Sequence, residues 1–432
     1  MALVMHEAFI HYVWQFQYID KSALTTTAGE RVVVIKTGNY NTNQGPDFSN
    51  AKVKIGDIEW AGHVEIHICS SDWNRHAHAQ DLAYNNVVLH VVWKHDLDIK
   101  RADGSSIPTL ELQNRVDAGL AKSYHRLVNS GLSIPCKKSF SAIPRVTQFS
   151  MMEKAVAQRL RAKSLVVLEL LEKNKGDWEE TFYQTLCRNF GFKVNADAFF
   201  QLARVIPYRL LQKQGGSLLQ VEALLFGGAG MLEAKTKDEY LSALFQEYRL
   251  LQRKYNLAEE QMHYAQWKFL RLRPANFPTL RIAQLAGILF TQKNILSRVL
   301  EITAWRDIQE MFQSHSSAYW QSHYRFGSKA TKVIEGIGKS SIENIVINSV
   351  VPLLAAYSQA KDDQQFMDKA ILWLEQLPGE ENKITRAWHD LGLSVKSAFD
   401  SQALIEQYNN MCQKRNCLNC VVGASLIKPS VG

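Results

Sequence analysis

Two acidic residues near the start of the chain have a spacing that suits a shared metal ion. Asp47 lies in residues 45–48 (GPDF), and Glu65 lies eighteen positions later in residues 62–67 (GHVEIH). That separation accommodates one strand, a tight turn at Gly56 and half of the next strand, so the two carboxylates would stand on neighbouring strands. Carboxylate oxygens are the ligands that Mg²⁺ and Mn²⁺ prefer. We therefore predict that Asp47 and Glu65 hold Mg²⁺ or Mn²⁺.

Two further side chains could complete a catalytic group with this acidic pair. His67 follows Glu65 by two residues and faces the same side of a strand, where an imidazole could deprotonate or orient water. Glu7, in the first predicted helix, could supply another carboxylate. Each residue also has an ordinary structural interpretation: a turn residue for Asp47, an exposed strand residue for Glu65, a hydrogen-bonded core residue for His67, and an exposed helical charge for Glu7. We predict all four as catalytic residues.

A second group of residues could contact nucleic acid. His76-Ala77-His78 lies in a part of the chain where histidines are concentrated. Such a pair can meet phosphates or give two ligands to Zn²⁺, although histidines on a loop often have no such role. Arg271 and Arg273 lie in a proline-containing corner between predicted helices, where they could contact phosphates or backbone carbonyls. We predict His76, His78, Arg271 and Arg273 as nucleic-acid contacts.

Three cysteines lie close together near the end of the chain, as Cys412-x₄-Cys417-x₂-Cys420. Thiols at such spacings bind Zn²⁺ or an iron–sulfur cluster, and the same spacing occurs in plant-type two-iron ferredoxins. The alternative is three ordinary thiols in a reducing cytosol. A fourth ligand would have to come from Cys136, Cys187, Cys69 or a histidine. Cys136 is our first choice, because it follows Pro135 between two predicted domains, and Cys187 is the second.

Composition is that of a globular protein: 432 residues, 46% hydrophobic and 21% charged. The net charge of +8 weakly favours polyanionic partners such as nucleic acid. No apolar run is long enough for a membrane-spanning helix, and the first residues lack the basic start of a signal peptide. We therefore predict a cytoplasmic protein that does not enter the membrane, and we infer no obligate protein partner.

Hydrophobic patterning predicts an α+β fold with two main domains. An amphipathic helix is expected at 3–18, with strands at 31–36, 47–55, 58–68, 87–93 and 108–113, and a helix-sized connector at 70–86. Beyond residue 115 we expect helices and no strand, including one helix at 258–270. The predicted parts are an α+β domain at 1–115, a bridge at 116–145, an all-α domain at 146–411 and a cysteine-rich tail at 412–432.

The order of these elements and the acidic motif resemble the PD-(D/E)xK nuclease superfamily. Asp47 and Glu65-x-His67 correspond to its acid … acid-x-Lys motif, with His67 in place of the lysine. The resemblance implies an αβββαβ restriction-endonuclease-like domain. Some of these nucleases hold an iron–sulfur cluster with one upstream and three C-terminal cysteines, which favours Cys136 or Cys187 as the fourth ligand here.

The whole chain also resembles a bacterial family of proteins of unknown function that is frequent in Bacteroidetes (DUF2851-like). The resembling segments span nearly the full length: 45–48, 62–73, 78–92, 188–195, 272–286 and 412–423. This resemblance implies no activity.

Together these features predict a Mg²⁺-dependent nuclease that hydrolyses phosphodiester bonds of DNA or RNA. Two alternatives remain open. One is a nucleic-acid-binding or scaffold protein whose catalytic site has decayed, as the missing lysine would allow. The other is a Zn²⁺ metallohydrolase that acts on a non-nucleic substrate through His63, His67, His76 and His78.

Overall fold

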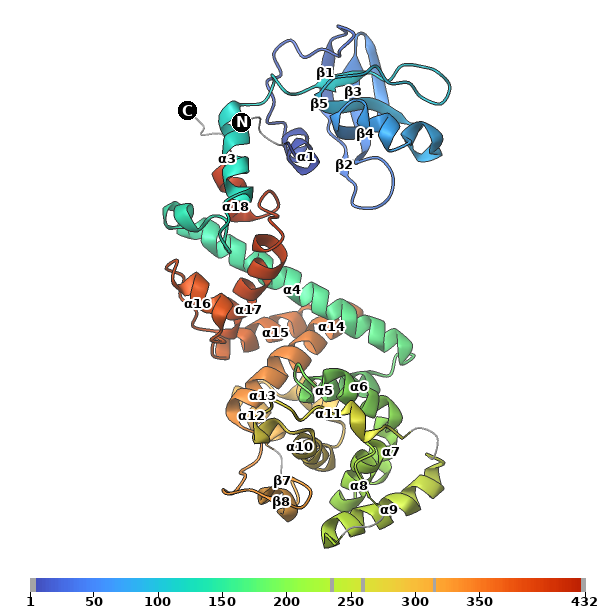
Figure 1. Cartoon of the computed structure of the whole chain (residues 1–432), viewed down its shortest axis with the longest axis vertical. Helices are drawn as coiled ribbons and strands as arrows, with labels where there is room; N and C mark the ends of the chain where they lie inside the picture. The colour runs from blue at the N-terminus through green and yellow to red at the C-terminus, as the bar shows by residue number, and fades with distance from the viewer. Residues whose placement is uncertain (1–4, 234–236, 258–260, 314–315, 429–432) are drawn as a thin grey trace. The chain divides into compact units, whose positions relative to one another are not determined.

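The computed structural model describes residues 5–233, 237–257, 261–313 and 316–428 (Figure 1). The chain divides into two compact units. The first unit combines residues 1–152 with the C-terminal stretch 407–432, and the second contains residues 153–406. Helix α4 (Arg145–Lys173) passes from the first unit into the second. The C-terminal segment therefore returns to the N-terminal unit after the helical region.

The first unit is built on one mixed β-sheet. Its main path runs β1-β3-β4-β5-β6, and β2 pairs with β3 at one edge. Strand β3 is antiparallel to β1 and β4, whereas β4, β5 and β6 run parallel to one another. The strands are β1 (Val32–Lys36), β2 (Asn39–Tyr40), β3 (Phe48–Ile55), β4 (Ile58–Cys69), β5 (Val87–Lys94) and β6 (Thr109–Glu111).

The interior strand β5 is buried on both faces at residues 87–92, and these residues are apolar except for His90. Such a run suits an interior strand flanked by parallel neighbours. In β4 the alternation of side chains puts Val64 and Ile66 into the apolar core. Glu65 and His67, which alternate with them, are also buried but belong to a polar cluster. The sheet thus has a polar, buried region on the face opposite that part of the core.

Gly62 permits the close approach of β4 to β5. A Cβ atom at this position would come within 2.4 Å of Cγ1 of Val88 and 2.5 Å of the carbonyl oxygen of Asn86. The backbone N–H of His63 donates to that same carbonyl at 2.8 Å. The parallel register that follows places Glu65 opposite His90.

Helices and turns complete the first unit around the sheet. Helix α1 (Glu7–Gln15) packs through Phe9, whose ring stacks on Tyr124 of α3 (Ala118–Val128) at 4.8 Å. Asp117 caps α3 by accepting a hydrogen bond from the backbone N–H of Leu120. The remaining elements are α2 (Asp72–Arg75), α18 (Val421–Ile427), the 3-10 turns η1 (His78–Gln80), η2 (Leu82–Tyr84) and η3 (Lys137–Ala142), and the π-helical turn η8 (Gln407–Cys412).

The second unit is largely helical. After α4 it contains α5 (Trp178–Phe190), α6 (Ala196–Val205), α7 (Tyr208–Lys213), α8 (Leu218–Gly228), α9 (Glu239–Tyr255), α10 (Pro278–Thr291), α11 (Ile295–Glu301), α12 (Trp305–Phe312), α13 (Lys339–Ile345), α14 (Val351–Lys361), α15 (Gln364–Gln376), α16 (Lys383–His389) and α17 (Ala398–Glu406). None of the helices in the described ranges is long and apolar enough to span a membrane.

The predicted α+β class is confirmed, since a mixed sheet near the N-terminus is followed by a largely helical region. Two details of the prediction are wrong. A short hairpin, β7 (His323–Arg325) with β8 (Ser328–Lys329), lies where no strand was expected. The helix expected at 258–270 includes 258–260, which lie outside the described residues, and its described part has only the 3-10 turn η4 (Tyr264–Gln266). The predicted domain bounds stay a prediction.

Candidate metal centre

The two predicted acidic residues lie next to each other at the start of β3 and the middle of β4. The backbone N–H of Asp47 donates to Oε2 of Glu65 at 3.1 Å. In return, Oδ2 of Asp47 accepts the backbone N–H of Ile66 at 2.9 Å. The loop before β3 holds Asp47 in place, because its carbonyl accepts the N–H of Asn41 at 2.7 Å.

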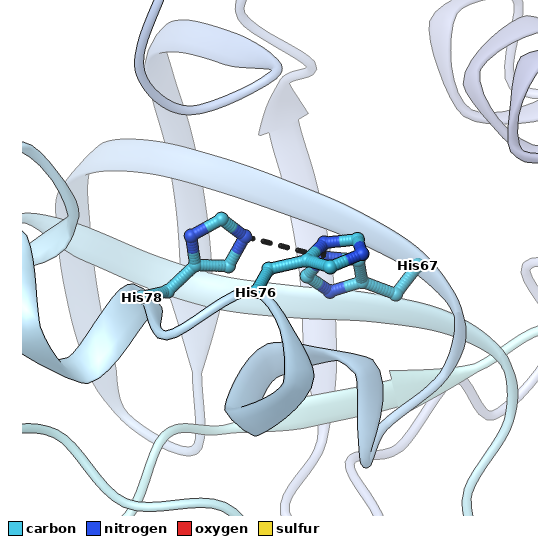
Figure 2. A group of neighbouring side chains, drawn as sticks. All are labelled: His67, His76 and His78. Carbon is cyan, nitrogen blue, oxygen red and sulfur yellow. Dashed lines mark hydrogen bonds between the residues drawn. The ribbon is translucent and has the colours of Figure 1, made fainter.

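Three imidazoles crowd together beside Glu65. Nε2 of His67 lies 3.1 Å from Nδ1 of His76 and 3.3 Å from Nε2 of His78. All three nitrogens are within 4.8 Å of one another, and Figure 2 shows the rings turned toward a common point. Oε1 of Glu65 is 3.2 Å from Nε2 of His78 and 3.6 Å from Nε2 of His67. We call Glu65, His67, His76 and His78 the histidine centre.

This crowding is unfavourable without a cation. A neutral imidazole nitrogen carries either one proton or one lone pair, so Nε2 of His67 cannot satisfy all its close neighbours by hydrogen bonds. In a tetrahedral zinc site with Zn–N bonds of about 2.05 Å, the nitrogens lie about 3.3 Å apart. The spacing around His67 matches that value, so the residues fit one metal ion.

The local backbone brings His76 and His78 back over β4. Helix α2 begins directly after the strand, and Ala77 then adopts a left-handed conformation with φ 58° and ψ 28°. This conformation is uncommon for a residue with a Cβ atom. It turns the chain between the two histidines, so that both rings reach His67 from the same loop.

A fourth histidine, His90, contacts the ring of His67 on the side away from His76 and His78. Nδ1 of His67 lies 2.8 Å from Nε2 of His90, which is fully buried in β5. If Nε2 of His67 binds a metal, its Nδ1 keeps the proton and donates it to His90, an arrangement that fixes a ligating ring. Trp73 and Tyr84 hold the neighbouring rings, since Tyr84 stacks on His78 at 3.8 Å and Trp73 meets His90 edge-on at 5.5 Å.

Burial sets the charge state of the centre in the absence of an ion. Burial, reinforced by the neighbouring imidazoles, lowers the pKa of His67 to about 2, and burial likewise lowers the pKa of His90 to about 3. Burial raises the pKa of Glu65, an effect that the hydrogen bond from His78 opposes. The rings of His67 and His90 are therefore neutral, which is the form of imidazole that binds a metal, and a cation would favour the ionised form of Glu65.

The first helix adds two residues to the edge of the centre. Nε2 of His11 lies 3.2 Å from Oδ2 of Asp47. Glu7, one helical turn earlier on the same face of α1, is half-buried, and burial raises its pKa. The charges of His11, Asp47 and His76 all influence Glu7, so its carboxyl group is close to the centre.

The predicted nucleic-acid contacts belong to two different units of the structure. His76 and His78 belong to the histidine centre, and His78 is buried. Arg271 and Arg273 are exposed in the second unit, beside the turn η5 (Pro274–Asn276). Neither arginine belongs to the unit that carries the centre.

The four predicted cysteine ligands lie in the first unit and line one pocket: Cys136, Cys412, Cys417 and Cys420. The predicted second choice, Cys187, is fully buried in α5 of the other unit. Among the described residues, the set of three or more ligand atoms within 4.8 Å of one another is the histidine trio, so no three of the cysteine sulfurs come that close.

Three residues of the site were not predicted as functional: His11, Tyr84 and His90. A signal existed for His11, because it stands four residues after Glu7 and so shares its helix face. His90 lies in an apolar strand, where a histidine is usually an ordinary core residue. Tyr84 lies in a polar connector whose path the sequence does not define.

Comparison with known proteins gives one match. The model of a family described as "Protein of unknown function (DUF2851)" matches residues 7–383. No curated protein matches the chain significantly. No solved structure does so either.

Proposed function

The chain belongs to the DUF2851 family of proteins of unknown function, and we propose that it is a metal-dependent hydrolase that cleaves phosphodiester bonds of nucleic acid. The observation that carries the proposal is the histidine centre beside Asp47, where three imidazole nitrogens and one carboxylate oxygen converge. Such ligand sets occur in hydrolases that activate water.

The ligands favour a transition metal over Mg²⁺. Mg²⁺ prefers oxygen ligands in octahedral geometry, whereas imidazoles suit Zn²⁺ and Fe²⁺. We therefore assign Zn²⁺ or a similar ion to Glu65, His67, His76 and His78, in place of the Mg²⁺ or Mn²⁺ that the acidic pair alone predicts.

The residues around the proposed metal ion could assist the activation of water. A metal at the centre would lower the pKa of bound water to about 7 and stabilise charge on a phosphate. Asp47 is positioned by the N–H of Ile66 and paired with His11 at 3.2 Å, so this pair could take up the proton released from water. Glu7 adds a carboxylate from α1 at the edge of the centre.

The nucleic-acid substrate is inferred from the order of the elements. If the two-residue strand β2 is set aside, helix α1, strands β1, β3 and β4, the connector with α2, and strand β5 resemble the αβββαβ order of a restriction-endonuclease-like domain. Asp47 precedes the second of these strands and Glu65 lies within the third, as in a PD-(D/E)xK motif. The net charge of +8 favours a polyanionic partner.

A second candidate is a metallohydrolase with a non-nucleic substrate. The three-imidazole set favours it, because His67 stands where the nuclease motif has a lysine and is joined by His76 and His78. A catalytically decayed scaffold is less well supported, since Glu65 contacts both Asp47 and His67.

Cleavage assays test the proposal. Metal-free protein is supplied in turn with Zn²⁺, Mn²⁺, Fe²⁺ and Mg²⁺, and offered single- and double-stranded DNA, RNA, a small phosphodiester and a carboxylic ester. We expect cleavage of a nucleic acid, strongest with a transition metal. Glu65→Gln and Asp47→Asn should abolish it, because each removes a carboxylate of the centre.

The matched control is His389→Ala, which removes an exposed imidazole in the second unit. It should cleave as the wild type does. If Glu65→Gln, purified in the same way, cleaved at the wild-type rate, the cleavage would come from a contaminating nuclease and the proposal would be refuted. Hydrolysis of the ester alone would favour the second candidate.

A further inference from the structure

Four thiols from distant parts of the sequence share one pocket in the first unit. Cys136 precedes η3, whereas Cys412 ends η8 and is followed by Cys417 and Cys420 before α18 begins. All four line the same pocket and all are buried. None of them forms a disulfide. We call Cys136, Cys412, Cys417 and Cys420 the thiol pocket.

The spacing of the sulfurs in the thiol pocket favours a cluster over a single zinc ion. Around one Zn²⁺ with Zn–S bonds of about 2.3 Å, four sulfurs would lie about 3.8 Å apart. In the thiol pocket no three sulfurs come within 4.8 Å of one another. Wider spacing is expected when the thiolates bind different iron atoms of one cluster.

The thiols are nevertheless close enough for each to affect the pKa of its neighbours through electrostatic interactions. Burial, with the nearby Cys420 and Cys417, raises the pKa of Cys136 to about 12. Burial and Cys420 raise the pKa of Cys417 to about 11. Burial, with the other three thiols, also raises the pKa of Cys412. Four thiolates in such a place require positive charge between them.

The surroundings suit thiolate ligands. Nε2 of Gln407 donates to Sγ of Cys420 at 3.0 Å. Burial raises the pKa of Cys412 and of Cys417, and the charge of Arg415 partly opposes that rise; Nη1 of Arg415 donates to the carbonyl of Leu132 at 2.6 Å. The rest of the lining is mostly apolar, as a solvent-excluded cluster needs: Leu127, Pro135, Met151, Met411 and Val422.

We infer that the thiol pocket binds an iron–sulfur cluster through Cys136, Cys412, Cys417 and Cys420. Of the two metal groups that the cysteine spacing in the sequence leaves open, the wider spacing of the sulfurs in the pocket favours the cluster. Because protein thiolates fill every external position, the cluster has no open site for a substrate. It joins the C-terminal segment to the chain around Cys136 and so stabilises the first unit.

Anaerobic purification of the full chain tests this inference. We expect brown protein with visible absorption from sulfide-to-iron charge transfer, and equal amounts of iron and acid-labile sulfide. About two or about four irons per chain would identify the cluster type. Apo protein should regain the same spectrum on incubation with ferrous iron and sulfide.

Single substitutions show whether these four thiols are the ligands. Cys136→Ser and Cys420→Ser should lose most of the iron and sulfide. Cys187→Ser, in the second unit, and Cys69→Ser, at the end of β4, should keep both. Circular dichroism of each variant separates loss of the cluster from loss of the fold, and the wild-type metal content needs no variant.

Three results would overturn the inference: one zinc per chain without sulfide, no iron uptake during reconstitution, or equal iron loss from Cys187→Ser and Cys420→Ser. None of these results bears on the hydrolase proposal, because the histidine centre shares no ligand with the thiol pocket.

Discussion

The histidine centre and the thiol pocket lie in the same unit but differ in ligand type and spacing. In the histidine centre, donor atoms stand 3.1–3.6 Å from Nε2 of His67 and leave room for one ion. In the thiol pocket no three sulfurs approach within 4.8 Å. The proposals for the two regions therefore differ in the metal group: close nitrogen and oxygen donors suit a single ion, whereas wider-spaced thiols suit a cluster.

The two regions also differ in how the chain assembles them. The histidine centre draws its ligands from residues 65–78, with His90 one strand away. The thiol pocket joins Cys136 to residues 412–420, which are far away in sequence. A metal that closes such a long loop contributes mainly to stability. We therefore expect the histidine centre to control activity and the thiol pocket to control the stability of the first unit.

The largest expected effect follows from removing the central ligand. His67→Ala should lower nuclease activity by more than about 100-fold, because even loss of a second-shell partner costs about 10–100-fold. The variant should also lose the ion of the histidine centre while keeping its iron and sulfide. Metal analysis of the same preparation, alongside cleavage assays, measures both effects.

Cys420→Ser is the complementary variant, and it should show the reverse pattern. It loses iron but keeps the ion at the histidine centre, and its cleavage rate per folded molecule stays close to that of the wild type. If His67→Ala released iron as efficiently as Cys420→Ser does, the two regions would not be independent and the comparison would fail.

A smaller effect on metal affinity is expected from substitution of His90, which contacts His67. His90→Leu removes the acceptor for Nδ1 of His67 and should weaken metal affinity by about 10–100-fold. His90→Gln keeps an acceptor oxygen and should recover part of that affinity. Titration of metal-free protein with Zn²⁺ measures both variants.

Thermal unfolding serves as the control for the His90 pair. If both variants unfold at the same temperature but differ in affinity, His90 acts by positioning His67. Equal affinities for Leu and Gln would instead mean that His90 is only a packing residue.

Much of the first unit could be predicted from hydrophobic patterning. The strands expected at 31–36, 47–55, 58–68, 87–93 and 108–113 correspond to β1, β3, β4, β5 and β6. Their signals are physical: β5 is apolar from Val87 to Trp93 apart from His90, and β4 alternates core residues with Glu65 and His67. The hairpin β7–β8 could not be predicted, because strands of three and two residues are too short to show alternation.

The proximity of Asp47, Glu65 and His67 follows from strand pairing, which the sequence indicates. The approach of His76 and His78 to His67 could not be predicted in this way, because it depends on the left-handed conformation of Ala77. No local rule assigns that conformation to alanine. The contact between His67 and His90 depends on the parallel register of β4 and β5, which is set by tertiary packing.

The smallest expected effect concerns His63, which sharpens the boundary of the histidine centre. His63 lies two residues before Glu65 and was a candidate zinc ligand, yet it is not in the group of nitrogens around His67. It is half-buried, and its Nδ1 has no hydrogen-bond partner among the described residues. His63→Ala should therefore change the free energy of unfolding by less than about 0.5 kcal/mol. It should change the cleavage rate by no more than about 2-fold, which corresponds to a similar energy.

The reference variant for this prediction is His78→Ala, which removes a proposed metal ligand and should lose the ion. Metal content and cleavage rates of both variants test the boundary. Loss of the ion from His63→Ala would mean that four histidines, rather than three with Glu65, hold the metal.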